Sequence, residues 1–168
     1  MKDTVLNMML KKNISNLIII LIVFFLDRIS KYIILKLSQP LGELSVSVTS
    51  FLNFNLIWNK GVAFGFFSLE QDLYYNLLTM IIIAVTLIII WLASRSQRLE
   101  KISYLMIIGG SFGNIFDRLY YSSVLDFIDI SINNFHWFIF NVADIFITLG
   151  VILLIILEFF NKKNHETN

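Results

Sequence analysis

Long apolar runs alternate with short polar segments along this chain of 168 residues. A bilayer core of about 30 Å is crossed by around 20 mostly apolar residues of a helix. Four segments meet this requirement, over residues 14–35, 74–93, 102–121 and 137–160, and they predict four transmembrane helices. The first apolar run lacks a small-residue cleavage site and is followed by charges, so we interpret it as a retained helix rather than a signal peptide.

The segment of residues 36–73 is long for a simple connection between two spans. Apolar and polar residues alternate over 44–49 and again over 51–56, as in antiparallel strands. The apolar, Gly-containing run at 61–67 is suited to a lipid interface. We therefore predict an all-α membrane protein with four transmembrane helices and a small extracytoplasmic β-rich cap. No flexible linker divides the chain, so residues 1–168 are expected to form a single integral membrane domain.

The basic residues outside the predicted spans indicate the orientation. They form three clusters, which are Lys2, Lys11 and Lys12; Arg95, Arg98 and Lys101; and Lys162 and Lys163. With four spans, all three clusters lie on one side of the membrane. The positive-inside rule then predicts that both termini are cytoplasmic and that the cap is outside.

The composition agrees with a membrane protein and excludes several kinds of chemistry. Hydrophobic residues make up 57% and charged residues 15% of the chain, against about 45–50% and about 25% in soluble domains. The net charge of +1 provides no clustered basic face, so no nucleic acid is expected as a partner. The absence of Cys excludes thiolate catalysis and Cys-zinc sites, and His136 and His165 have no paired-His metal spacing.

Polar side chains interrupt three of the predicted spans, where their cost makes them candidates for function. In each span they are three or four residues apart and so share one helix face. The sets are Asp27 with Lys31; Asn114 with Asp117 and Arg118; and Asn141 with Asp144. At a rise of about 1.5 Å per residue, all three sets lie in the outer half of the bilayer. Three such faces at one depth predict a polar pocket that opens outward.

Two further acids, Asp126 and Asp129, follow the third predicted span in the segment VLDFID. A carboxylate at this outer rim can approach Asp144, which lies one to two turns down the last span. Two carboxyl groups close together cannot both ionise easily, so one keeps a proton near neutral pH. The ionised group can take a proton from water while the protonated group polarises a peptide carbonyl. Such a pair is the arrangement that an aspartic protease needs.

At these residues the chain resembles the lipoprotein signal peptidase family (signal peptidase II), the membrane aspartic proteases of bacteria. The matching blocks, in the family's order, are DRISK at 27–31, NKGVAFG at 59–65, GGSFGNIFDR at 109–118, VLDFID at 124–129 and FNVAD at 140–144. The resemblance implies that Asp126 and Asp144 are the catalytic dyad. It implies substrate-binding or supporting roles for Asp27, Asn59, Gly61, Asn114, Arg118 and Asn141.

The resemblance also implies a substrate, a location and an inhibitor. The family cleaves prolipoproteins before a Cys that carries diacylglycerol, and it uses no metal or cofactor. The expected partners are therefore a diacylglyceryl-prolipoprotein, membrane lipid and globomycin-type inhibitors. The expected location is the bacterial cytoplasmic (inner) membrane, with the active site near the extracytoplasmic face.

Structural roles compete with catalytic ones at several of these positions. Asp117 adjoins Arg118, and we expect it to support the site through an internal ion pair or a helix-orienting network. Asn114 and Asn141 are neutral and cost less to bury, so they could orient the carboxyl groups. Asp129 is expected to tolerate replacement by Asn.

Two other functions fit parts of the sequence. Residues 109–113 match the GxSxG pattern of serine hydrolases, which suggests a rhomboid-like serine protease as a weak alternative. The pattern lies within a span, where small residues favour close helix packing. Buried acids would also suit a proton- or cation-coupled transporter. The second span and the inner halves of the first and fourth spans are almost purely apolar, which favours an outward-facing enzyme site.

Overall fold

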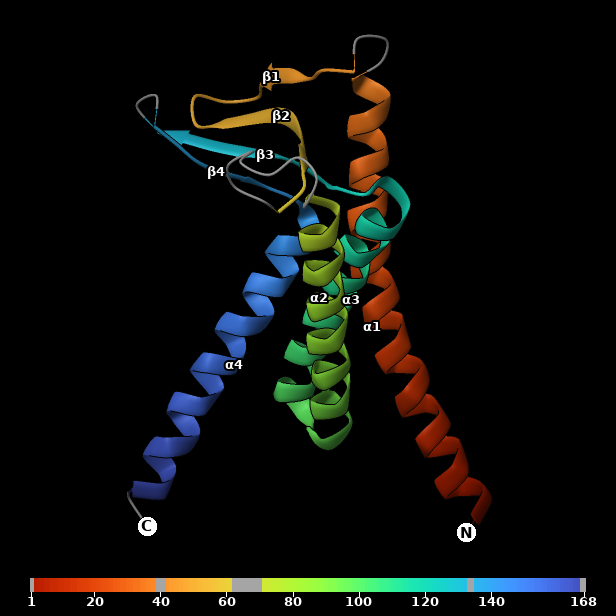
Figure 1. Ribbon diagram of the computed structural model, residues 1–168. Coiled ribbons are helices and arrows are strands. Elements are labelled where there is room, and N and C mark those ends of the chain that lie inside the picture. Colours follow the sequence, from red (N-terminus) through yellow and green to blue (C-terminus); the bar gives the residue numbers. More distant parts are fainter. Residues whose placement is uncertain (1, 39–41, 62–70, 133–134, 167–168) are drawn as a thin grey trace.

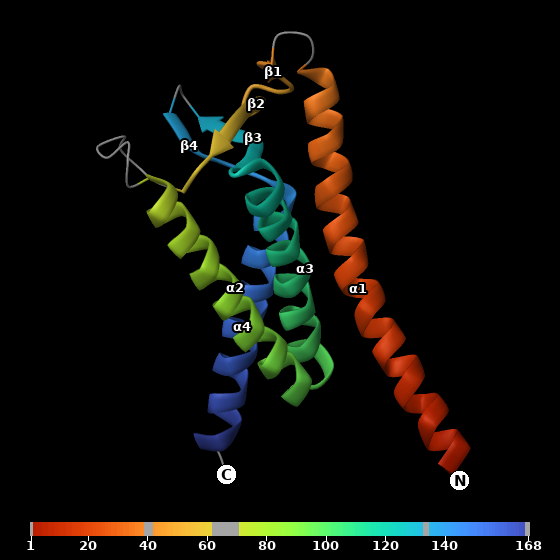
Figure 2. The ribbon, with the colours of Figure 1, turned by 45° about the vertical axis from the view of Figure 1, so that its right-hand side comes forward.

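The computed structural model describes residues 2–38, 42–61, 71–132 and 135–166, which form four helices and one antiparallel sheet. The helices are α1 (Lys2–Leu37), α2 (Gln71–Arg95), α3 (Arg98–Tyr121) and α4 (Val142–Glu166). The strands are β1 (Ser45–Ser47), β2 (Leu52–Asn59), β3 (Val124–Ile132) and β4 (Phe135–Phe140). The sheet lies at one end of the helices, and the two ends of the chain lie at the other (Figures 1 and 2).

Helix α3 is the central helix and contacts α1, α2 and α4. Toward the chain ends, α1 and α4 diverge from it (Figure 1). Small residues let α4 approach closely, since a Cβ added at Gly110 would lie 2.6 Å from the carbonyl oxygen of Ala143. The GxSxG pattern thus lies inside α3, where it supports helix packing, and not at the strand-to-helix turn that a serine nucleophile would need.

Among the described residues, two helical stretches are long and apolar enough to cross a membrane, Leu73–Arg95 of α2 and Val142–Phe160 of α4. Helices α1 and α3, with 36 and 24 residues, also have sufficient length, but they carry the charged residues of the predicted pocket. Large apolar side chains, including Phe25 and Met80, point outward rather than into a core. Exposed apolar side chains on these helices are expected where lipid is the solvent.

The sheet is larger than the predicted cap, because half of its strands come from residues 124–140. The alternation at 44–49 and 51–56 corresponds to β1 and β2. The segment after α3, taken from the sequence as a loop and the start of a span, instead forms β3 and β4. Helix α4 accordingly begins at Val142 and not at residue 137. Apart from Gly61, the apolar run at 61–67 lies outside the described residues.

The strands follow the order β1-β2-β3-β4, and each neighbouring pair is antiparallel. The pairing of β2 with β3 contains an irregularity, because Phe54 lies opposite Ile128 whereas Ile57 lies opposite Asp126. Two residues of β2, at 55–56, therefore face a single residue of β3. This one-residue β-bulge lies directly beside the strand positions that reach the polar site.

Beneath the sheet, the buried side chains of Leu125 and Phe127 pack against Ile34 of α1. This small core joins β3 to the outer part of α1. It fixes the strand that carries Asp126 relative to the helix that carries Asp27.

Candidate active site

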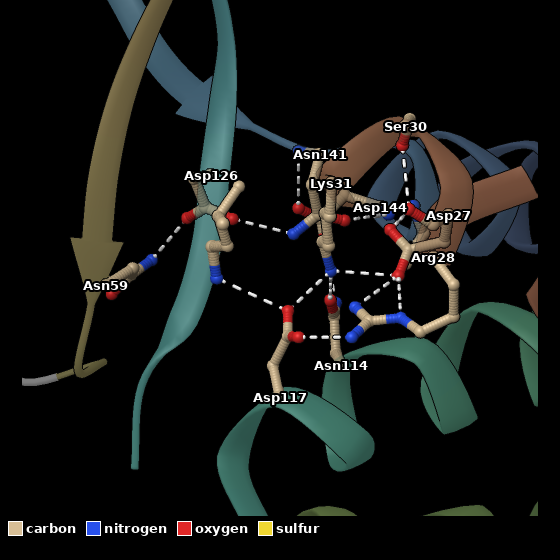
Figure 3. Close-up of polar contacts among 12 residues, drawn as sticks. Asp27, Arg28, Ser30, Lys31, Asn59, Asn114, Asp117, Asp126, Asn141 and Asp144 are labelled. Carbon is tan, nitrogen blue, oxygen red and sulfur yellow. Dashed lines mark hydrogen bonds and ion pairs between the residues drawn. The ribbon is translucent and has the colours of Figure 1, made fainter. Parts of the chain in front are cut away.

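The predicted catalytic and supporting residues come together where the sheet meets the helices, and all of them except Gly61 and Arg118 are labelled in Figure 3. They come from five elements and the turns beside them: Asp27 from α1, Asn59 from the end of β2 with Gly61 just after it, Asn114, Asp117 and Arg118 from α3, Asp126 from β3, and Asn141 and Asp144 at the start of α4.

Asn141 and Asp144 form the N-terminal cap of α4. The backbone N–H of Asp144 donates to Asn141 Oδ1 at 3.0 Å, and the backbone N–H of Asn141 donates to Asp144 Oδ2 at 3.1 Å. This reciprocal pair is a capping box, which satisfies N–H groups that the first turn of a helix leaves free. The same bonds fix the positions of both side chains. An Asn three residues before an Asp is a sequence signal for this helix start, and the interpretation of residues 137–160 as one span missed it.

Asn141 also links the two acids of the proposed pair. Its Nδ2 donates to Asp126 Oδ1 at 2.6 Å, while Asn59 Nδ2 donates to Asp126 Oδ2 at 2.8 Å. On the other acid, Asn114 Nδ2 donates to Asp144 Oδ1 at 2.8 Å. Every oxygen of the two carboxyl groups thus accepts a hydrogen bond from a neutral donor (Figure 3).

The other two acids of the site, Asp27 and Asp117, are held by cations. Arg28 lies 2.8 Å from Asp27 and 2.6 Å from Asp117, the latter at ion-pair distance without hydrogen-bond geometry. Lys31 Nζ lies 2.9 Å from Asp27 and 2.7 Å from Asp117. The expectation that Asp117 pairs with Arg118 is therefore wrong, because the ion-pair partners of Asp117 are Arg28 and Lys31. Adjacent residues of a helix point in different directions, and Asp117 faces α1.

These ion-paired acids also bind the backbone of the segments that carry the other two. Asp27 Oδ1 accepts from the backbone N–H of Ala143 at 3.0 Å, in the first turn of α4, where a helix dipole favours an anion. Asp117 Oδ2 accepts from the backbone N–H of Leu125 at 3.3 Å, next to Asp126 on β3. Through these two acids, the ion-paired cluster holds in place the segments that carry Asp126 and Asp144.

Asp126 is 3% exposed and lies on β3, outside the helices. Burial raises the pKa of Asp126 above its ordinary value. The negative charge of Asp144 raises it further, whereas the hydrogen bonds from Asn59 and Asn141 and the positive charge of Lys31 lower it. The balance favours a proton on Asp126 more than water would, as suits one member of a proton-sharing pair.

Arg118 and Gly61 lie together at the edge of this site. The guanidinium of Arg118 lies 5.5 Å from the centre of the Tyr75 ring, and its Nε and Nη1 are buried without a partner among the described residues. Gly61 adopts φ +72°, and a Cβ there would lie 3.3 Å from Arg118 Nη2. The N–H of Gly61 donates to Asn59 Oδ1 at 2.7 Å, which orients the Asn59 amide toward Asp126.

A mostly apolar groove of about 220 Å³ borders Asp144. Its lining residues are Phe138, Phe140, Asp144, Ile145, Thr148 and Leu149. Within the described ranges, no group of three or more His, Cys, Asp and Glu side chains could hold a metal ion.

Asp129 does not lie at an exposed rim, as its place in the sequence suggested. Its side chain is fully buried, and Oδ2 accepts from Asn55 Nδ2 at 2.6 Å and lies 2.7 Å from His136 Nδ1. Of the two acids in the VLDFID segment, Asp126 is therefore the one that Asn141 links to Asp144.

Comparison with known proteins shows the family to which the chain belongs. The family model described as signal peptidase (SPase) II matches residues 19–160. The chain belongs to the signal peptidase II family. A protein named lipoprotein signal peptidase from Pelagibacter ubique (strain HTCC1062) is 47% identical over 161 residues, which cover 95% of this chain and 97% of that protein. One of the same name from Anaplasma phagocytophilum (strain HZ) is 36% identical, covering 95% of this chain and 99% of that one.

A solved structure described as a bacterial membrane enzyme has the same fold. It superimposes with a TM-score of 0.71 at 28% sequence identity, covering 89% of this chain and 90% of that chain. The chain is therefore a membrane protein with the fold of a membrane enzyme. Membership of the signal peptidase II family confirms the resemblance and the predicted removal of signal peptides from prolipoproteins, and it opposes the transporter alternative.

Proposed function

We propose that the chain is an aspartic endopeptidase in which Asp126 and Asp144 are the catalytic pair. Its substrates would be diacylglyceryl-modified prolipoproteins, cleaved before the lipid-bearing Cys. The name lipoprotein signal peptidase, which its relatives carry, supports a lipoprotein precursor as the substrate.

The observation that carries this proposal is the division of the four acids of the site, Asp27, Asp117, Asp126 and Asp144, into two kinds. Asp27 and Asp117 are neutralised by Arg28 and Lys31, so their carboxylates have a structural task. Among the described residues, Asp126 and Asp144 are held by asparagine and backbone N–H donors and form no ion pair with a cation. A carboxyl group without a paired cation is free to gain and lose a proton, which a general acid or base must do.

The reaction follows from this arrangement. One carboxylate takes a proton from a water molecule, which attacks the peptide carbonyl, and the protonated partner donates a hydrogen bond to the carbonyl oxygen. The proton then passes to the leaving amine. Asp126 and Asp144 share one proton as a coupled pair, so the proton belongs to the pair and not to one residue.

Neighbouring features suit the substrate. The guanidinium of Arg118 lies beside Gly61 at the edge of the site, and its positive charge can bind a substrate carbonyl or a lipid phosphate. The apolar groove beside Asp144 has the character that a fatty acyl chain requires. A globomycin-type cyclic peptide would occupy the same region and exclude substrate. Asn59 and Asn114 orient the pair.

We further propose a single integral membrane domain with four transmembrane helices, in the bacterial cytoplasmic (inner) membrane. The two chain ends lie opposite the sheet (Figure 1), and the three basic clusters belong to the side of these ends. Both termini would be cytoplasmic and the sheet would be extracytoplasmic. The acids would then meet substrate at the outer face, where lipoproteins emerge.

The test is cleavage of a fluorogenic diacylglyceryl-lipopeptide by purified variants. Asp126→Asn and Asp144→Asn should each lose activity by a factor of at least about 10²–10⁴, the usual contribution of a general acid or base. Ser111→Ala, in the GxSxG pattern, is the matched control and should retain wild-type cleavage. Substantial cleavage by either Asn variant would refute the aspartic mechanism. Loss of activity in Ser111→Ala, with labelling of the wild type by a fluorophosphonate, would favour a serine protease.

A further inference from the structure

The β-bulge in β2 decides which face of the sheet each asparagine of that strand reaches. Side chains alternate between the two faces of a strand, and directly opposed residues lie on the same face. In a regular strand Asn53, Asn55 and Asn59 would share one face, because they are an even number of residues apart. The pairing instead changes by one residue between Phe54 and Ile57. An inserted residue reverses the face of everything after it.

The contacts agree with this reversal. Before the bulge, Asn53 donates to Ser131 at 2.9 Å and Asn55 donates to Asp129 at 2.6 Å. After the bulge, Asn59 donates to Asp126 at 2.8 Å. Asp126 and Asp129 are three residues apart on β3, so they lie on opposite faces of the sheet. Without the bulge, Asn59 would point to the face of Asp129 and away from the proposed catalytic pair.

The hydrogen bond between Asn55 and Asp129 is made by a residue of the bulge. Asn55 is one of the two residues that oppose a single residue of β3. Its partner Asp129 is fully buried and is also held by His136 of β4. From the other side, the N–H of Leu56 donates to the carbonyl of Leu44 at 3.0 Å. The two bulge residues are thus held by a side-chain bond from Asn55 to β3 and by a backbone bond from Leu56 to Leu44.

We propose that Asn55 and Asp129 are positioning residues for the cleavage reaction, because their hydrogen bond holds the bulge that turns Asn59 toward Asp126. This inference rests on the proposed function of Asp126. Neither residue touches the reacting atoms, and each acts through Asn59.

The consequence for chemistry lies in the ionisation of Asp126. Its carboxyl group is faced by Asp144 of α4, by Lys31 of α1, and by the neutral amides of Asn59 and Asn141. The bond from Asn59 lowers the pKa of Asp126, so loss of this bond raises the pKa. A positioning role therefore predicts a shift of the pH–activity profile toward higher pH, which a general loss of stability would not produce.

The experiment compares three alanine variants in the lipopeptide cleavage assay across pH. Asn55→Ala should lower kcat by about three- to tenfold, the value of one neutral hydrogen bond, with KM unchanged and with its pH profile moved upward as in Asn59→Ala. The double variant Asn55→Ala/Asn59→Ala should shift the profile no further than Asn59→Ala alone. Asn53→Ala is the matched control. It removes a similar bond from β2 to β3 on the same face and should leave kcat and the profile unchanged.

Each other result would overturn the inference. A wild-type profile in Asn55→Ala would show that the bulge needs no such bond. Additive shifts in the double variant would show that Asn55 and Asn59 act separately. An equal shift in Asn53→Ala would point to general loosening of the sheet. If Asn55→Ala does not fold, Asn55→Val removes the donor while retaining a residue that favours strands. Cleavage by Asp126→Asn would instead overturn the proposed function, so the two failures are distinguishable.

Discussion

Replacement of Asp117 by Asn should destabilise the protein more than replacement of Asp126, although both acids are buried in the same site. Asp117 lies 2.6 Å from Arg28 and 2.7 Å from Lys31, and it accepts a backbone hydrogen bond from Leu125. The Asn variant removes the negative charge and leaves two cations that share the single carboxylate of Asp27.

The size of the effect follows from the burial of the partners. Side-chain exposure is 1% for Asp117, 3% for Lys31 and 15% for Arg28, so solvent screens these charges weakly. Breaking a buried ion pair costs about 3–5 kcal/mol, and the contacts that Asp27 retains favour the lower value. At about 2–4 °C per kcal/mol for a chain of this size, Asp117→Asn should lower the Tm by about 6–12 °C. Asp126→Asn loses a neutral hydrogen bond worth about 1 kcal/mol, and hence about 2–4 °C.

The assay is thermal unfolding of detergent-solubilised protein, followed by tryptophan fluorescence, with lipopeptide cleavage measured on the same samples. We expect Asp126→Asn to be inactive with a nearly normal Tm, and Asp117→Asn to be unstable with activity reduced in proportion to its folded fraction. Equal Tm values for the two variants would refute the division of the acids into those held by cations and those held by neutral hydrogen-bond donors.

Three further predictions concern pH, packing and topology. Folding raises the pKa of Asp126, so this residue stabilises the folded state at pH below its unfolded pKa of about 3.9, and the stabilisation is lost as pH rises through the folded pKa. Over this pH range the Tm of Asp126→Asn should therefore rise relative to the Tm of the wild type. A constant difference between the two Tm values would contradict this prediction. In Gly113→Ala, the added Cβ would lie 2.6 Å from Asp27 Oδ2. Tm and cleavage should therefore both fall, although Ala stabilises a helix by about 1 kcal/mol relative to Gly. An unchanged Tm would contradict this packing. A Cys introduced at Ser45 should react with an impermeant thiol reagent in intact cells while one at Ser94 should not, on a chain without native Cys; the opposite labelling would reverse the proposed orientation.

The helices, and the fact that this is a membrane protein, were predictable because a long apolar run forms few structures other than a membrane helix. The positions of the polar residues were equally informative, since spacings of three and four residues place Asn114 and Asp117 on one face of α3, toward Asp144 and Lys31. The start of α4 was placed too early, because the apolar residues 137–140 continue the hydrophobicity of the helix without a break. Only the capping box of Asn141 and Asp144 marks the boundary, and its signal is local rather than hydrophobic.

The strands β3 and β4 and the partner of Asp117 were not predictable in the same way. Strand pairing depends on residues far apart in the chain, such as Phe54 and Ile128, and no local pattern specifies the bulge between them. The ion pair of Asp117 likewise depends on how α1 packs against α3, whereas sequence adjacency suggested Arg118. Burial of Asp129 is a further consequence of this long-range pairing, since its place after a span indicated only a loop.

The capping box of α4 places the second acid of the proposed pair in a helix that the ribosome makes after α1, α2 and α3. While α1, α2 and α3 are being synthesised and inserted, Asp144 and Asn141 do not yet exist, and Asp27 has no N–H of Ala143 to accept. Asp126 at that stage lacks both its acidic partner and the amide that links the two. Under the proposed mechanism, a nascent chain that still lacks α4 would therefore be catalytically inert. Proteolytic competence would then arise only after α4 has joined the other helices.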